Sequence, residues 1–218
     1  KTMLTGDNII RDKISNEGTS DGGYRPTVNI IGLWMQQEIR RNFAAEGREY
    51  TFPQLAELAA KEKPLQSFIR PDDFMQPGDY PTKIREYCKQ TGQPVPQTDG
   101  ALVRCILESL ALKYKQTYLS LKPYITWEEK LYIVGGGVQN ELLNQYTANA
   151  LGIPVITGAS EATAVGNVMA QFKALGCYDT AQQKCDILAA SFDTKTYLPQ
   201  EQEAWQEAYG KFEQLMED

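Results

Sequence analysis

The chain has 218 residues, of which 42% are hydrophobic and 23% charged, a composition typical of a folded globular protein and not of a disordered or collagen-like one. It contains no histidine, which excludes serine–histidine nucleophilic chemistry, histidine zinc sites and an imidazole general base on this chain. The net charge is −6, so no excess of basic residues is available to bind nucleic acid or an anionic membrane.

The sequence carries no sign of a membrane anchor or an exported protein. No apolar run approaches the roughly 20 residues of a membrane span, and the first thirty residues lack the order of a signal peptide. We therefore predict a cytoplasmic protein. Lys1 opens the numbering and Met3 follows two residues later, which predicts a fragment or the remnant of a cleaved tag.

The cysteines do not form a metal-ligand pattern. Cys88, Cys105, Cys177 and Cys185 are too widely spaced for a C-x-x-C motif, and we predict buried or free thiols and no metal site. Cys88 and Cys105 are the pair that two neighbouring elements could bring together.

In chain order, residues 1–25 are rich in Gly, Asn, Asp and Ser and predict irregular structure with turns. Pro26 stands where a first helical turn tolerates proline, and the apolar spacing from Thr27 to Arg41 predicts a first helix. Prolines then separate short predicted helices at 54–62 and 81–90.

The sequence pattern of the second half of the chain predicts both helices and strands. Thr98 is a helix-capping residue, and the apolar pattern after it predicts a long, buried helix to about Leu121, in which Arg104 and Glu108 form a structural i,i+4 pair. The predicted elements that follow are a strand at 130–134, a glycine turn, a helix at 139–151, a strand at 154–156, helices at 161–175 and 180–190, an extended segment at 192–198 and a helix at 200–216. This order predicts one α/β domain over residues 1–218.

The glycine turn is the first candidate binding element. Gly135, Gly136 and Gly137 lack side chains and would let a ligand approach the backbone, and amides at the start of the next helix favour an anion. Asn140 lies in the first helical turn, where its side chain could reach a nucleotide. The spacing fits neither the dinucleotide-binding nor the P-loop pattern, so a purely structural turn remains an alternative.

The predicted first helix is the second candidate. Asn29, Leu33 and Gln37 recur at i, i+4 and i+8, with Gly32 and Gln36 on the same side. At 1.5 Å per residue, Asn29 and Gln37 would lie roughly 12 Å apart, enough to contact two parts of a bound pair such as a sugar and a nucleotide. An ordinary solvated helix face is the alternative.

Several ordered motifs together resemble the C-terminal lobe of the FGGY carbohydrate kinase family, in particular its rhamnulokinases. The resemblance extends over about residues 15–176 and rests on these segments: Asn16 to Gly18, Gly23 to Arg25, Asn29 to Trp34, Tyr87 and Cys88 with Thr91 to Gln93, Arg104 to Tyr114, Ile133 to Asn140, and Glu161 to Asn167.

The resemblance implies one lobe of a two-lobed sugar kinase with the ribonuclease-H-like, actin-like ATPase fold. Such a kinase transfers the γ-phosphoryl group of ATP, with magnesium, to a ketose; for rhamnulokinases the product is L-rhamnulose 1-phosphate. By resemblance, Asn29 corresponds to a sugar contact, Gln37 to a nucleotide contact, and Gly135 to Gly137 with Asn140 to the nucleotide-binding turn. The family's catalytic aspartate and a phosphate-binding threonine lie in segments that cannot be matched here.

We therefore expect the chain to need its missing N-terminal lobe and to be inactive alone, since phosphoryl transfer requires both positioning and charge neutralisation. We also expect the glycine turn and the amide-bearing side of the first helix to face one shared cleft. An L-fuculokinase or xylulokinase lobe, and a non-catalytic nucleotide-binding module, remain alternatives.

Overall fold

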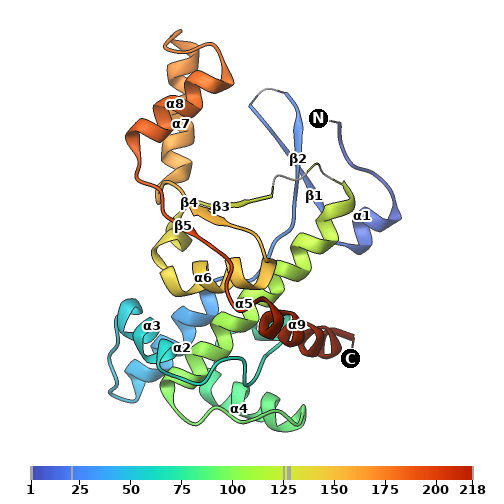
Figure 1. Ribbon diagram of the computed structural model, residues 1–218, viewed down its shortest axis with the longest axis vertical. Helices are drawn as coiled ribbons and strands as arrows, with labels where there is room; N and C mark the ends of the chain where they lie inside the picture. Colours follow the sequence, from blue (N-terminus) through green and yellow to red (C-terminus); the bar gives the residue numbers. More distant parts are fainter. Residues whose placement is uncertain (1, 21, 125, 127–128, 218) are drawn as a thin grey trace.

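The computed structural model describes residues 2–20, 22–124, 126 and 129–217 and consists mainly of helices (Figure 1). The α-helices are α1 (Asp7–Arg11), α2 (Trp34–Ala45), α3 (Phe52–Ala60), α4 (Tyr80–Gln90), α5 (Asp99–Leu121), α6 (Glu141–Leu151), α7 (Ala162–Ala174), α8 (Ala181–Ser191) and α9 (Gln202–Glu217). Short 3₁₀ helices are η1 (Pro71–Phe74), η2 (Lys122–Tyr124) and η3 (Gly136–Gln139). The strands are β1 (Ser15–Gly18), β2 (Tyr24–Thr27), β3 (Leu131–Ile133), β4 (Val155–Thr157) and β5 (Thr196–Tyr197).

Helix α5 is the centre of the core. Every residue from Leu102 to Leu112 is buried, as expected of a helix that is covered on all sides. Its start is set by Thr98, whose side chain accepts a hydrogen bond of 3.0 Å from the backbone N–H of Ala101. Gly100 permits close packing of α3, because a Cβ at this position would lie 2.6 Å from the carbonyl oxygen of Leu58. The predicted long, capped and buried helix is confirmed.

A small mixed sheet carries the glycine turn. Strands β3 and β4 are parallel, and β5 pairs antiparallel with β4, giving the order β3-β4-β5. Parallel β3 and β4 are joined through α6, which packs on α5 and α9 (Figure 1). The predicted sequence of strand, glycine turn, helix and strand is therefore confirmed, as are the predicted helices that correspond to α3, α4, α7, α8 and α9.

The N-terminal region differs from the prediction of irregular structure over residues 1–25. It contains α1 and a hairpin in which β1 pairs antiparallel with β2. The expected turn is present between the strands, where Gly22 has a φ of +80° and its N–H donates to the carbonyl oxygen of Thr19. Asp21 lies outside the described residues. Short polar strands with turn glycines resemble a loop in sequence, which explains the error.

The first long helix also begins later than predicted. The spacing predicted a helix from Thr27 to Arg41, whereas α2 runs from Trp34 to Ala45 and Pro26 belongs to strand β2. Residues 28–33 contain three β-branched side chains and Gly32, which disfavour a helix because they lose side-chain or backbone freedom there. The apolar spacing across this segment was therefore accidental.

The predicted pair of Arg104 and Glu108 is a buried ion pair, with 2.7 Å between Nε and Oε1. Arg104 also donates to the carbonyl oxygens of Ala59 and Glu62, and Glu108 accepts from the N–H of Leu65. Burial raises the pKa of Glu108 to about 7, because the surrounding charge and hydrogen bonds only partly offset the loss of water. The pair anchors the loop after α3 to α5.

We expect Glu108 to make stability depend on pH. Its pKa is higher in the folded protein than its ordinary value of 4.5, so the folded state holds the proton more tightly. The stabilisation that protonated Glu108 gives to the folded state is therefore fully present below about pH 4.5. As the pH rises to about 7, the free energy of unfolding should fall by on the order of 2–3 kcal/mol. In urea unfolding at about pH 5, 6 and 7, the free energy of unfolding should fall less with rising pH for Glu108→Gln than for the unmodified protein. Equal declines would contradict this prediction, and the exposed Glu86→Gln is the matched control.

Candidate functional site

A cavity of about 660 Å³ lies next to the glycine turn and is lined by several of the predicted site residues. This volume lies within the roughly 300–1,000 Å³ range of ligand pockets. Its walls come from the start of α2, from α3, and from η3 with the start of α6. The lining residues are Leu33, Gln36, Gln37, Phe52, Pro53, Ala56, Glu57, Gly136, Gly137, Gln139, Asn140, Glu141 and Leu142.

The glycine turn is fixed at its start by the sheet. The N–H of Gly135 donates to the carbonyl oxygen of Ala159 at 2.9 Å, and the N–H of Gly158 donates to Ile133 at 2.8 Å, so the loops after β3 and β4 stay paired. Gly135 has a φ of +80°, a conformation that side chains other than glycine rarely adopt. At this position the fold itself accounts for glycine.

The next two glycines have no such conformational requirement. Neither has a positive φ, and within the described chain no heavy atom lies within 4 Å of the place that a Cβ on Gly136 would occupy. At Gly137 a Cβ would make an ordinary contact of 3.8 Å with Ile133. Both residues line the cavity, so their small size keeps open a space that the protein does not fill. This is the arrangement expected where a ligand approaches a backbone closely.

Two asparagines of the α6 region hold the far end of the turn. Asn140 is the N-cap of α6, and its side-chain oxygen accepts a hydrogen bond of 3.0 Å from the N–H of Leu143. Asn144 is buried one turn later and donates at 3.0 Å to the carbonyl oxygen of Val138. Asn140 was predicted within the first helical turn; as the N-cap it lies just before it, and it still lines the cavity.

The amide-bearing start of α2 forms the facing wall. Gln37 is exposed and lines the cavity, and its N–H makes the first helical hydrogen bond, to Leu33. Gln36 is buried, with a 2% exposed surface, and its side-chain oxygen accepts a hydrogen bond of 3.1 Å from Asn140. The expectation that the glycine turn and this side of the helix share one cleft is therefore confirmed for Leu33, Gln36 and Gln37.

Asn29 does not belong to the same helix face as Gln37. It is exposed in the segment between β2 and α2, and it is not among the residues that line the cavity. The predicted separation of roughly 12 Å along one helix axis is wrong, because α2 begins only at Trp34. Its assignment as a sugar contact therefore rests on the family resemblance alone.

The sequence reasoning missed the contribution of α3. Phe52, Pro53 and Ala56 give the cavity an apolar side, and Glu57 adds a carboxylate. Helix α3 is placed by a capping box, in which Thr51 and Gln54 satisfy each other's backbone N–H groups. Phe52 is 40% exposed, and the Arg40 guanidinium lies 4.9 Å from its ring centre. The sequence signal that was available is Phe52, an aromatic residue directly after the helix-capping Thr51, at the start of α3.

The charges around the cavity are mainly negative or neutral. Glu57 and Glu141 line it, and Glu141 is paired at 2.7 Å with Lys195. Carboxylates accept hydrogen bonds from hydroxyl and amino groups, and amides both donate and accept them, whereas a carboxylate repels a phosphate. The described part of the chain also contains no group of three or more side chains arranged to hold a metal ion. This wall is therefore suited to the uncharged end of a ligand.

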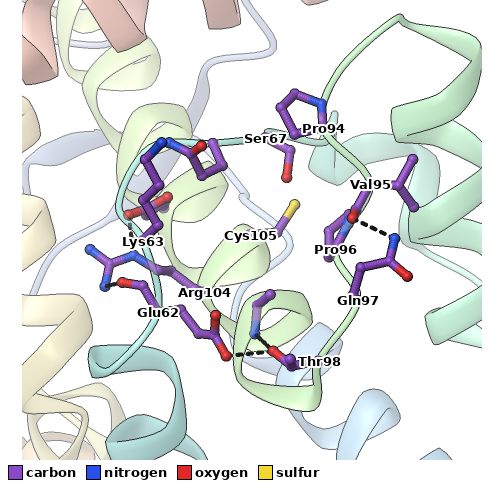
Figure 2. Close-up of a pocket in the computed structure, with 13 residues that line it drawn as sticks. Glu62, Lys63, Ser67, Pro94, Val95, Pro96, Gln97, Thr98, Arg104 and Cys105 are labelled. Carbon is purple, nitrogen blue, oxygen red and sulfur yellow. Dashed lines mark hydrogen bonds and ion pairs between the residues drawn. The ribbon is translucent and has the colours of Figure 1, made fainter.

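A second, smaller cavity of about 220 Å³ lies beside α5 (Figure 2). Its polar side chains are largely used within the protein, as Figure 2 shows for Thr98 with Glu62 and for Gln97 with the Val95 carbonyl oxygen. Cys105 lines this cavity and is hydrogen-bonded to Cys88, and this bond together with burial raises the pKa of the Cys105 thiol. As predicted, the four cysteines are free thiols, and the two neighbouring elements bring Cys88 and Cys105 together.

Both the sequence and the fold of the chain are similar to those of known proteins. Residues 7–175 match the family model described as the FGGY family of carbohydrate kinases, C-terminal domain. The chain belongs to this family. The FGGY domain is 44% identical over 201 residues to a rhamnulokinase of Bacteroides thetaiotaomicron, and 35% identical over 207 residues to one of Bacillus subtilis. These alignments cover 91% and 92% of this chain but only 41% of each relative, so the chain spans about two fifths of their length.

Solved structures show the same fold. A xylulose kinase from Rhodospirillum rubrum superposes on the FGGY domain with a TM-score of 0.67 at 20% identity, covering 89% of this chain and 39% of that one. A glycerol kinase from Plasmodium falciparum, solved with ADP, gives a TM-score of 0.60 at 13% identity, covering 89% and 37%. The predicted ribonuclease-H-like C-terminal fold is thereby confirmed. Among the described residues, no helix has the length and apolar character needed to cross a membrane.

Proposed function

We propose that this chain is the nucleotide-binding lobe of an ATP-dependent ketose kinase whose substrate is L-rhamnulose. The observation that carries the proposal is the shared cavity: Gln37 and the Gly136–Asn140 segment are about a hundred residues apart in sequence and line one hollow of suitable volume. The proposal for the sugar is supported by the rhamnulokinases named above, with identities up to 44%. We also propose that the kinase is cytoplasmic, which its composition and free cysteines support.

In this proposal the cavity holds the nucleoside end of ATP. The apolar side formed by Phe52 and Ala56 suits the base, and the carboxylate of Glu57 can accept from an amino or hydroxyl group. Gly136 and Gly137 let the backbone approach the start of the phosphate chain, and Gln37 and Asn140 supply amides. Asn29, outside the cavity, is proposed to contact the sugar.

The rest of the catalytic machinery is proposed to come from the N-terminal lobe. The carboxylate-bearing wall cannot neutralise a triphosphate, so positive charge and the group that orients the sugar hydroxyl must be supplied across the cleft. Magnesium enters as part of the MgATP substrate, since it is usually bound through phosphate oxygens and few protein ligands. Closure of two lobes would then exclude water from the reaction.

The proposal predicts a specific pattern of activity. The full-length kinase that contains this segment should phosphorylate L-rhamnulose with MgATP in preference to L-fuculose and D-xylulose in a coupled ADP assay. The 218-residue chain alone should show no turnover with any of the three, because it lacks the opposing lobe. Preference for another ketose would contradict the assignment of L-rhamnulose as the substrate. Turnover by the isolated chain would contradict the proposal that catalysis needs the opposing lobe.

Gly136→Val should weaken nucleotide binding without unfolding the protein. The valine side chain would enter the open space next to the turn, where no described atom lies within 4 Å of the added Cβ. We expect the dissociation constant for ADP, measured by calorimetry on the full-length kinase, to rise at least about ten-fold, which corresponds to roughly 1.4 kcal/mol. Gly210→Val, on the exposed surface of α9, is the control. Unchanged ADP affinity in Gly136→Val would remove the turn from the binding site.

Asn29→Ala should raise the KM for the sugar more than the KM for ATP. The residue is exposed and lies apart from the cavity that Gln37 lines, so its loss should leave nucleotide binding nearly unchanged. Steady-state kinetics on the full-length kinase, varying each substrate in turn, gives both constants. An increase confined to the KM for ATP would show that Asn29 is wrongly assigned.

A further inference from the structure

We infer that Gln36, which none of the comparisons assigns a role, is a positioning residue that holds Asn140 and thereby the glycine turn in the form that binds nucleotide. This inference rests on the proposed function. The residue lies in the first turn of α2, next to Gln37 but on the buried side, and its surface is only 2% exposed. It lines the cavity together with Asn140.

The contact between the two side chains fixes the Asn140 amide from both sides. The oxygen of Asn140 accepts from the N–H of Leu143 at 3.0 Å, and its nitrogen donates to the side-chain oxygen of Gln36 at 3.1 Å. Rotation of the amide would therefore break two hydrogen bonds at once. The backbone N–H of Asn140 also donates to Gly137 at 3.1 Å, so the position of this residue sets that of the turn.

The same hydrogen bond directly joins two walls that both rest on α5 and otherwise have different neighbours. Helix α2 packs on α4 and α5, whereas α6 packs on α5 and α9. Gln36 and Asn140 are 104 residues apart, and their bond connects the start of α2 directly to the N-cap of α6 across the edge of the cavity. A side chain with this geometry can keep the width of the cavity constant.

A purely structural role would not explain the choice of glutamine. The side-chain nitrogen of Gln36 is buried and, within the described residues, has no hydrogen-bond partner. A buried donor without an acceptor costs stability, so an apolar residue of the same shape would suit the fold at least as well. The polar contribution of this side chain is therefore its oxygen, which accepts the hydrogen bond from Asn140.

Gln36→Met tests this separation between stability and binding. Methionine has nearly the same shape but cannot accept the hydrogen bond from Asn140. In the full-length kinase we expect the ADP dissociation constant to rise roughly three- to ten-fold, the usual range for one lost hydrogen bond. The KM for the sugar should change less than about two-fold, and the urea midpoint should stay the same or rise. Gln36→Leu should have the same effect as Gln36→Met. Gln66→Met is the matched control, because the Gln66 amide donates to the nearby Pro64 carbonyl oxygen and lies outside the cavity lined by Gln36.

A double-mutant cycle shows whether Gln36 acts through Asn140. If it does, Gln36→Met should cause no further loss of ADP affinity in a kinase that already carries Asn140→Ala. Additive losses would overturn the inference, as would unchanged ADP affinity in Gln36→Met when the unmodified kinase binds ADP. If the unmodified kinase does not bind ADP, the proposed function itself fails, and the inference that rests on it fails too.

Discussion

The packing of α6 against α5 is the constraint on which the cavity depends. Leu143 and Tyr146 of α6 belong to the main core, and the Tyr146 ring lies 5.5 Å from that of Trp205 and 5.2 Å from the Arg104 guanidinium. The same helix carries Asn144 on its buried side and begins at Asn140. Because those two asparagines hold the far end of the glycine turn, the backbone that faces the cavity is attached to a helix of the main core.

Buried polar groups in this protein divide into two kinds. Arg104 and Glu108 satisfy each other and several backbone groups, so their cost of desolvation is offset by the loop they secure. Gln36 is only half satisfied, with an oxygen that is used and a nitrogen that is not. The first arrangement belongs to the core, and the second stands at the edge of a hollow. The side-chain nitrogen of Gln36 therefore lies beside the proposed binding wall, unpaired among the residues that the structure describes.

Much of the second half of the fold could be predicted from local sequence, because the signals there are strong and independent. Thr98 caps a helix whose apolar residues occur on every side, and a short apolar strand ends at Gly135. The N-terminal part could not be predicted in this way. Ile30 and Ile31 lie at helical spacing from Trp34 and Met35 but favour extended backbone. The start of α2 is decided by tertiary packing of Met35 and Ile39.

The candidate site was predictable only in part. The glycines, Gln37 and Asn140 could be named from their residue types and their family resemblance, and the structure brings most of them to one cavity. The α3 wall and the buried amide of Gln36 depend on which helix faces come together, which spacing within a single element does not reveal. Asn29 shows the opposite case, in which a regular spacing suggested a geometry that the backbone does not adopt.

The last helix lies beyond the stretch that the family model matches, yet it is part of the main core. The match ends at residue 175, yet Trp205, Ala208, Tyr209 and Phe212 of α9 are buried in the main core. Trimming the polypeptide at the family boundary would strip aromatic cover from Tyr146 and leave the helix that bears the asparagines open to water. For this lobe, the boundary of the family model and the boundary of the packed core do not coincide.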